Sequence, residues 1–553
     1  MRHYLLMGLL LLSAFGAAGE ARAFGRCDDG AYMRGFDNRL GPTSCRTVHT
    51  SLIVWHGGTA DLRVILPGAS LPVVDEGVFR ERIDELVRRV GPAMNQMGGR
   101  LALGEVSILL SNLEFRGYHA VTRTRAGECQ ITFFKDGRDI SVDQFLFTLS
   151  HELFHCIQYD TWESANGDDP ALWWMEGTAE YFAHLANRNS AEADSILLQY
   201  DQDSPDVPLL DMNYPAQVFF LWLGGSRGSE AIPPFIAGMA SAPGRAAQLE
   251  AMRERIPMDT WMAFAQDYID GRIRLPGGRE LPGGVDFGRT TVIDGPRTVA
   301  FDTSEYVLTR QQLLFKKGRT YTLAQLGGVG DYRSRFDESL GEWIDPPERV
   351  LACDEDRVHT VLSLATEGEN VTYSIQVEES ARIDERACCL VGRWQPTEAA
   401  RRSEPDMALA NTQAILASHG VDMQCGVGDG GWTLVFTEDG TGHVDWEGFA
   451  YQCFAREGGN AFGNVFTREG STVFDWTVVE RGVGRADYTD NSLAWTHDTH
   501  FGPQVMTRVL PDAGPSTPAN NFSFTCSDTS LSIQGIYGLN HQQGEYTRLG
   551  TRP

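Results

Sequence analysis

The pattern of apolar and polar positions changes along the chain and predicts helices mainly in its first half and strands in its second. Between residues 76 and 98, apolar residues recur every three or four positions with arginine and glutamate between them, as on an amphipathic helix. Strand-like runs precede this helix at 47–66 and follow it at 101–110 and 129–134. This order predicts a mixed sheet that lies over the helix that comes next.

That next helix has a clear start signal at Ser141. A serine can cap a helix, and Gln144 stands three residues later, where a capping-box partner is found. The residues expected on its buried side are spaced at helical intervals: Phe145, Leu149, Leu153 and Ile157.

Further helices are predicted up to about residue 290. One is expected to start at Asp169-Pro170, a cap followed by a first-turn proline, and to end near Asn187. Another is expected over 214–223, ended by Gly224-Gly225, and residues 230–270 look largely helical.

From about residue 291 the pattern changes to strands. Alternating runs at 298–326 and 358–377 predict a small β-sandwich over 291–385. From 386 to 553 the chain offers short strands joined by Asp-Gly and glycine-rich turns. This last part resembles a small lipocalin-like antiparallel β-barrel.

Composition and charge restrict the compartment and the partners. The 553 residues are too many for one hydrophobic core, and the net charge of -27 argues against nucleic acid or an anionic membrane as partner. Residues 1–23 have the basic start, apolar stretch and small-residue cleavage site of a secretory signal, with cleavage expected after Ala23. The apolar run is too short to span a membrane, so a secreted or periplasmic protein is expected.

The ten cysteines all follow the expected cleavage point, and an even number in an exported chain favours disulfides. The sequence has no C-x-x-C pair, which makes a cysteine zinc site improbable. Proximity suggests two pairs, Cys27 with Cys45 and Cys129 with Cys156. The second pair would anchor the helix that starts at Ser141 to the strand before it.

The candidate chemistry lies on that helix, in the H-E-x-x-H pattern of residues 151–155. On a helix, His151 and His155 project from one face and can bind one zinc ion (Zn²⁺) as neutral imidazoles. Glu152 lies where it can take a proton from a water molecule that the metal activates. By itself the pattern is also compatible with two histidines that serve only the packing of a helix.

The segment W-M-E-G-T-A-E-Y at 174–181 adds two carboxylates. Glu176 follows His155 by 21 positions, on the next predicted helix, where it can be the third metal ligand. Together with the histidine motif, it resembles the gluzincin metallopeptidases, the thermolysin-type and aminopeptidase-type relatives. Met175 stands where those families usually have asparagine, and the spacing is slightly longer.

The resemblance implies a zincin-like metallopeptidase domain of α+β class over 24–290, with peptides or proteins as substrates. It also implies that Glu180, one turn after Glu176, orients a ligand histidine, most simply His151. Tyr214 resembles the tyrosine that donates to the oxyanion in aminopeptidase-type members, and Tyr200 is the reserve candidate.

An endopeptidase is favoured over an aminopeptidase. Residues 91–95, G-P-A-M-N, look superficially like an aminopeptidase motif but lack its glutamate, and they fall in the amphipathic helix, where packing is the better interpretation. A different class of function stays open, namely a secreted protein that keeps the zincin fold without catalysis and binds a ligand or a surface through its C-terminal β domains. The oligomeric state, the substrate and any calcium site are left open by the sequence.

Overall fold

The computed structural model describes residues 45–549 except for these segments: 68–75, 99, 111–118, 126–127, 135–139, 163–170, 189, 327–331, 338–342, 354, 369–370, 383–384, 403–421, 438–439, 458–459, 481–482, 493, 502–503, 512–518, 528 and 535–543. The chain divides into two compact units, Met1–Asp286 and Phe287–Pro553, and each is described by itself. Within the described residues, no helix is both long enough and apolar enough to cross a membrane. The expected signal segment and Cys27 lie outside the described residues.

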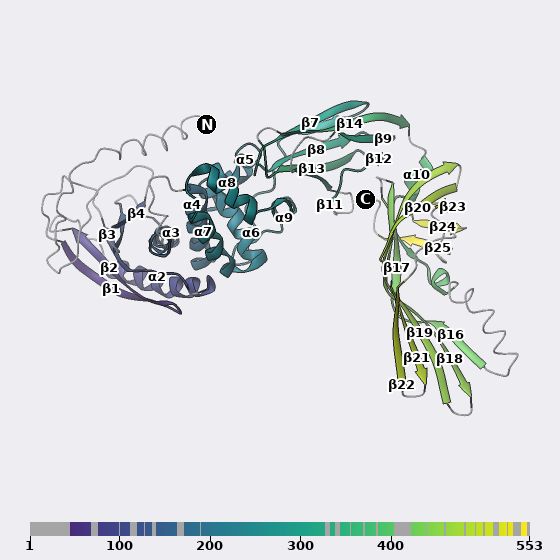
Figure 1. Cartoon of the computed structure of the whole chain (residues 1–553), viewed down its shortest axis with the longest axis horizontal. Coiled ribbons are helices and arrows are strands. Elements are labelled where there is room, and N and C mark those ends of the chain that lie inside the picture. Colours follow the sequence, from purple (N-terminus) through teal and green to yellow (C-terminus); the bar gives the residue numbers. More distant parts are fainter. Residues whose placement is uncertain are drawn as a thin grey trace. The chain divides into compact units, whose positions relative to one another are not determined.

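The first unit opens with a mixed five-stranded sheet and a long helix (Figure 1). These elements are β1 (Cys45–Trp55), β2 (Gly58–Pro67), α2 (Glu76–Gln96), β3 (Glu105–Leu110), β4 (Ala120–Arg125) and β5 (Glu128–Phe133). The strand order is β1-β2-β3-β5-β4, with β3 parallel to both of its neighbours. The predicted mixed sheet is therefore confirmed, although β4, its edge strand, was not predicted.

Helix α2 packs closely against the sheet because of a glycine. A Cβ atom at Gly91 would collide with the carbonyl oxygen of Val54 on β1, so only glycine permits this approach. Ala93 and Met94, in the next turn, are fully buried. The interpretation of residues 91–95 as packing residues of a helix is confirmed.

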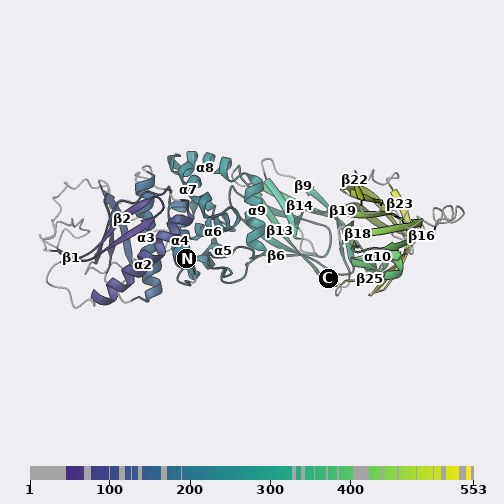
Figure 2. The ribbon, with the colours of Figure 1, turned by 90° about the horizontal axis from the view of Figure 1, so that it is seen from below.

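Seven further α-helices and three short 3₁₀ turns complete the described part of the first unit. They are α3 (Val142–Thr161), α4 (Leu172–Ala186), α5 (Asp194–Asp203), η3 (Leu209–Asp211), η4 (Tyr214–Ala216), α6 (Gln217–Arg227), η5 (Ser229–Ala231), α7 (Ile232–Ala240), α8 (Gly244–Arg255) and α9 (Met258–Ile269). Both α2 and α3 cover one face of the sheet (Figure 2). The ring of Phe145 on α3 contacts Phe79 of α2 and Phe133 of β5, so one side chain joins all three elements.

Three predicted helix ends need correction. At the start of α3, Ser141 does accept a hydrogen bond from Gln144 N, but the Gln144 side chain lies beside His119 rather than returning to the cap. Helix α4 begins at Leu172 without a side-chain cap, and the predicted signal at 169–170 lies outside the described residues. Helix α6 continues through Gly224-Gly225 to Arg227. Gly224 lies against the Tyr181 hydroxyl, where a Cβ atom would not fit, so this glycine serves packing and does not end the helix.

The second unit begins with two sheets that share one hydrophobic core. Their strands are β6 (Thr290–Ile293), β7 (Arg297–Thr303), β8 (Thr309–Phe315), β9 (Arg319–Leu326), β10 (Tyr332–Asp337), β11 (Trp343–Ile344), β12 (Arg349–Ala352), β13 (Arg357–Ala365) and β14 (Val371–Arg382). The strand orders are β11-β10-β13-β8-β6 and β12-β9-β14-β7. Buried residues from both sheets, such as Phe315 and Ile375, form the core between them, which is the arrangement of a sandwich.

The last part of the unit is an antiparallel barrel. Its elements are α10 (Glu385–Leu390), β15 (Gly392–Pro396), β16 (Asp422–Val427), β17 (Gly431–Phe436), β18 (Thr441–Glu457), β19 (Asn460–Glu480), β20 (Val483–Asn491), β21 (Ala494–Phe501), β22 (Gln504–Pro511), β23 (Ala519–Cys526), β24 (Ser530–Gln534) and β25 (Gly544–Arg548). Eight strands close on themselves in the order β18-β17-β15-β25-β24-β23-β20-β19, because β18 also pairs with β19. The predicted antiparallel barrel is confirmed.

Aromatic side chains fill the inside of this barrel. Trp394, Trp432, Trp476 and Phe436 belong to one buried cluster with their neighbours on the facing strands. A small barrel whose inward positions are filled in this way has a packed core rather than a ligand cavity.

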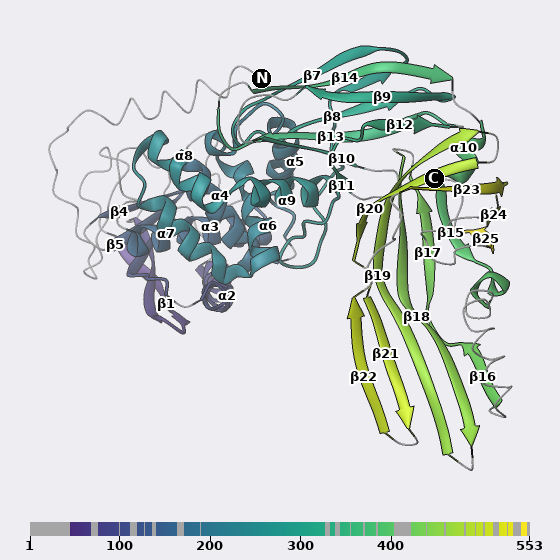
Figure 3. The same ribbon diagram turned by 45° about the vertical axis from the view of Figure 1, so that its right-hand side comes forward.

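The two longest strands, β18 and β19, continue past the barrel and carry further strands of the same eleven-stranded sheet, as Figure 3 shows. The far half of β18 pairs with β16, the far half of β19 pairs with β21, and β22 pairs with β21 at the outer edge. A disulfide between Cys425 and Cys453 joins β16 to β18. The sequence analysis did not predict this extension.

The described residues contain four disulfides. The predicted Cys129–Cys156 pair is present and ties β5 to α3. Besides Cys425–Cys453, Cys353 pairs with Cys388 and Cys389 pairs with Cys526, so adjacent cysteines of α10 reach two different strand ends. The suggested Cys27–Cys45 pair lies outside the residues whose side chains are described.

Candidate metal centre

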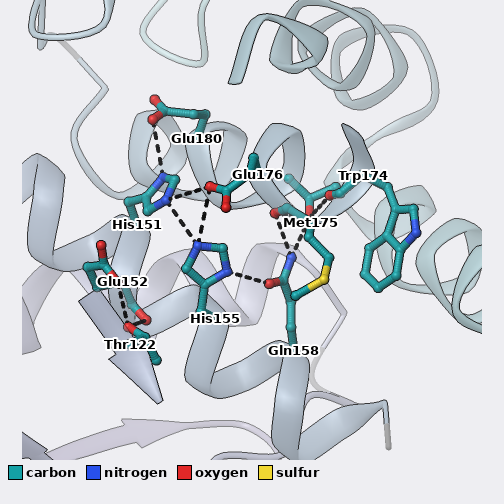
Figure 4. A network of polar contacts seen from close by, with 10 residues as sticks. Thr122, His151, Glu152, His155, Gln158, Trp174, Met175, Glu176 and Glu180 are labelled. Atoms are coloured by element: carbon teal, nitrogen blue, oxygen red, sulfur yellow. Dashed lines mark hydrogen bonds and ion pairs between the residues drawn. The ribbon is translucent and has the colours of Figure 1, made fainter. Parts of the chain in front are cut away.

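Helices α3 and α4 bring three candidate ligands together. The four-residue spacing places His151 and His155 on the face of α3 that packs against α4, and both imidazoles are buried. The disulfide at Cys156, next to His155, fixes this turn of α3 to β5. Glu176 faces the histidines from the first turns of α4 (Figure 4).

Gly177, the residue after Glu176, allows α6 and η4 to approach α4 closely. A Cβ atom at Gly177 would lie 2.9 Å from the Phe220 ring of α6 and 3.1 Å from the backbone of Ala216 in η4. Distances that short are sterically unfavourable, so glycine allows α6 and η4 to pack directly on α4. This packing brings Tyr214, the first residue of η4, to the metal-binding face.

Three donor atoms form a nearly equilateral triangle. The Nε2 atoms of His151 and His155 are 3.1 Å apart, and Glu176 Oε2 lies 3.2 Å from the first and 3.4 Å from the second. Donor atoms bound tetrahedrally to zinc at 2.0–2.1 Å are separated by about 3.3 Å. The three atoms therefore already have the spacing that one tetrahedral zinc ion requires, and they are the group of histidine and carboxylate ligands that the described residues offer for a metal.

The other ring nitrogen of each histidine faces an acceptor. His151 Nδ1 lies 3.2 Å from Glu180 Oε1, and His155 Nδ1 lies 2.7 Å from Gln158 Oε1. The Gln158 amide donates to the carbonyl of Met175 at 2.8 Å and to the Thr178 hydroxyl at 2.9 Å, which fixes its oxygen towards His155. Gln158 accepts at His155 Nδ1, and the Glu180 carboxylate lies at ion-pair distance from His151 Nδ1. Protons on these two nitrogens leave both Nε2 lone pairs free for a metal.

The charges of the site favour a cation. Burial lowers the pKa of His151, but Glu176 and Glu180 outweigh that effect and raise this pKa well above its usual value. Burial raises the pKa of Glu176, but the two histidines outweigh it and hold this pKa far below its usual range. Glu176 Oε2 is buried and receives no hydrogen bond of good geometry. A metal ion at the centre of the triangle would satisfy this negative charge.

Glu152 is also buried and is held from the neighbouring strand. Thr122 of β4 places its hydroxyl 2.5 Å from Glu152 Oε2 and 2.9 Å from the Glu152 carbonyl oxygen. Burial lowers the pKa of His155, but Glu176 outweighs this effect and raises that pKa. The charge of Glu152 makes a smaller contribution in the same direction as Glu176. The structure therefore places this carboxylate beside the metal ligands.

Two tyrosines flank the histidines. The Tyr214 ring lies 5.7 Å from the His151 ring, centroid to centroid, and the Tyr159 ring lies 6.4 Å from the His155 ring. Burial, together with the charges of Glu176 and Glu152, raises the pKa of Tyr159 to about 12, so its hydroxyl keeps its proton at neutral pH. Tyr200 is fully buried between Phe264 and Tyr268 and does not join the site.

His184 lies one turn beyond Glu180 and belongs to the hydrophobic interior. Its ring packs edge-on against Phe147, and it is fully buried. Burial lowers the pKa of His184 to about 4, so this imidazole is neutral at physiological pH. This environment indicates a structural role for His184.

Three residues near the ligands were missed by sequence reasoning. Gln158 and Tyr159 follow His155 by three and four positions, and helical spacing alone would have identified them as neighbours of the ligand face. Thr122 has no such signal, because it reaches Glu152 from a strand 30 residues earlier.

The three residues that the sequence predicted as metal ligands lie together in the structure. Of the described residues, His151, His155 and Glu176 form the group able to hold a metal ion, and Glu152 and Glu180 lie around them in Figure 4. The Tyr214 ring lies beside that of His151. No family model matches the chain, and no curated protein matches it either.

Proposed function

We propose that this protein is an exported zinc-dependent peptidase that hydrolyses peptide bonds, with an endopeptidase preferred to an aminopeptidase. The observation that carries the proposal is the triangle of His151 Nε2, His155 Nε2 and Glu176 Oε2, whose edges measure 3.1, 3.2 and 3.4 Å. Three protein ligands leave one tetrahedral position for water, as in catalytic zinc sites.

Glu152 is the general base and acid of the proposed reaction. A bound zinc ion supplies Lewis acidity, which lowers the pKa of a water molecule and polarises a peptide carbonyl. Glu152 takes the proton from the attacking water and gives it to the amine that leaves. This role fits a carboxylate that is buried beside the ligands and held by Thr122.

The surrounding residues orient the ligands and stabilise charge. Glu180 and Gln158 hold the histidines with Nε2 directed to the metal. Tyr214 and Tyr159 have phenol groups on either side of the histidine pair, where one hydroxyl can donate to the oxyanion that develops during attack.

A peptide substrate fits the free edge of the sheet. Strand β5 cannot accept a peptide at either edge, because it pairs with β3 on one side and with β4 on the other. Among the described strands, β4 lies at one edge of the sheet and β1 at the other, and β4 carries the residue that contacts Glu152. An extended peptide added to β4 would run past the general base, as an internal cleavage site requires.

Metal content and cleavage, measured together, test the proposal. Purified wild-type protein is expected to hold one zinc ion per chain and to cleave an unfolded protein, with loss of activity in a chelator and recovery on adding zinc. The Glu152→Gln variant is expected to keep the zinc and lose at least 100-fold in kcat, because the proton transfer has no acceptor. The His155→Ala variant is expected to lose both.

These variants separate the peptidase from the alternative, a binding protein that retains the zincin fold without catalysis. Wild-type levels of cleavage in Glu152→Gln would rule out the proposed base, and zinc binding without cleavage in the wild type would favour the alternative. The packed interior of the barrel does not support capture of a ligand inside it. Four disulfides among the described residues support an extracellular environment.

A further inference from the structure

The contact between Thr122 and Glu152 is short and directional. A threonine hydroxyl has one proton, and the Glu152 carboxylate at 2.5 Å is a closer and stronger acceptor than the Glu152 carbonyl at 2.9 Å. The proton therefore points to Oε2. The bond therefore fixes one of the two carboxylate oxygens of Glu152.

The backbone around Thr122 makes this contact rigid. Thr122 lies opposite Ile131 in the β4–β5 ladder, so both side chains face α3. Strand β5 is joined to α3 by the Cys129–Cys156 disulfide, and the Phe133 ring lies 4.9 Å from the Phe145 ring. The distance between the strand that carries the hydroxyl and the helix that carries the carboxylate is thereby fixed.

We propose that Thr122 is a positioning residue for Glu152, through which the edge strand β4 sets the direction of the general base. The inference rests on the proposed function, because it gives Glu152 the role of base. It adds that β4, the strand proposed to bind the peptide, is linked through Thr122 to Glu152, the carboxylate proposed to assist cleavage.

A purely structural role for Thr122 is the competing explanation, and Thr132 provides the matched control. Thr132 is a buried threonine on β5, and its hydroxyl accepts a hydrogen bond from Gln130. It faces the opposite side of the sheet from Ile131 and does not contact Glu152. Thr132→Val removes the same group from the same sheet, so it measures the effect of losing a buried hydroxyl alone.

The experiment compares the zinc-loaded full-length protein with Thr122→Val, Thr122→Ser, Thr132→Val and Glu152→Gln. Two readouts are taken: kcat and KM on a peptide, and the affinity of a peptidyl hydroxamate measured by calorimetry. The hydroxamate is a zinc chelator whose acidic proton needs a correctly placed carboxylate, so it reports on Glu152 without any turnover. Zinc content and thermal unfolding are recorded for each variant.

Thr122→Val is expected to lower kcat about 10- to 100-fold with KM changed less than threefold, because a misdirected base slows proton transfer and leaves binding intact. It is expected to weaken the hydroxamate about tenfold, whereas Thr122→Ser restores both values and Thr132→Val changes neither. Wild-type kcat and hydroxamate affinity in Thr122→Val would overturn the inference, as would equal losses in Thr132→Val. If the wild type cleaves no peptide but the hydroxamate pattern is observed, the peptidase proposal fails and the positioning role of Thr122 stands.

Discussion

At the scale of single residues, the metal centre depends on which nitrogen of each histidine carries the proton. Glu180 and Gln158 approach the two Nδ1 atoms from different helices, one with a carboxylate and one with an amide. Gln158 is itself fixed by Met175 and Thr178, both on α4. The ligand geometry is therefore set by neighbours that do not touch the metal.

Replacing Gln158 by leucine tests this dependence. The change removes the acceptor at His155 Nδ1, so the ring loses its fixed tautomer, and zinc affinity is expected to fall about 10- to 100-fold. The measurement is competition for zinc with a chromogenic chelator. Gln248→Leu serves as control, since Gln248 is a buried glutamine that bonds the Met239 and Ala242 carbonyls away from the site. Equal zinc affinity in both variants would contradict the role given to Gln158.

The buried imidazole of His184 is expected to make the stability of the folded protein depend on pH. The folded protein lowers the pKa of this imidazole from 6.5 to about 4, so the unfolded chain binds the proton more readily between those values. The stabilisation is complete above pH 6.5 and is lost as the pH falls towards 4, by roughly 3 kcal/mol if no other group compensates.

The comparison that isolates His184 is urea unfolding of zinc-free wild type and His184→Gln at pH 7 and pH 4.5. The variant is expected to lose less unfolding free energy between the two pH values, because its amide does not titrate. Identical losses in the two proteins would show that the buried imidazole does not limit acid stability.

At the scale of elements, the site lies where strand β5 and helices α3 and α4 meet, and a disulfide joins β5 to α3. The Cys129–Cys156 disulfide links β5 to α3 at the residue after ligand His155. Gly177 lets η4 and α6 pack on α4 beside Glu176. We expect that a change at the disulfide or at Gly177 shifts the candidate ligands even when the ligand residues themselves are unchanged.

Removal of this disulfide is expected to lower both stability and metal binding. A pair separated by 27 residues restrains the unfolded chain by roughly 3–4 kcal/mol. The double variant Cys129→Ala, Cys156→Ala is expected to show this loss in urea unfolding and a weaker affinity for zinc. The Cys425–Cys453 pair closes a loop of almost the same size, 28 residues, so Cys425→Ala, Cys453→Ala is a matched control. A similar effect of both double variants on zinc affinity would contradict a specific link between the first disulfide and the metal centre.

At the scale of the whole molecule, sequence patterns predicted what local spacing determines and missed what distant pairing determines. The helical repeat placed His151, His155 and Glu176, and strand alternation predicted both the mixed sheet and the barrel. Strand β4 and its Thr122 were missed because their partners are set by tertiary pairing. The extension built on β18 and β19 was missed for the same reason, since the alternation of a long strand does not indicate where the barrel ends and the extension begins.

The closure of the barrel has a consequence for the order of folding. Strand β15 near residue 394 must pair with β25 near residue 546, and the Cys389–Cys526 bond also spans most of that distance. Such pairing waits until the last strands have been synthesised, and contacts so distant in sequence form slowly. The metal ligands, by contrast, all precede residue 287, within the first compact unit. During synthesis, the candidate metal centre can therefore assemble while the barrel is still an open chain.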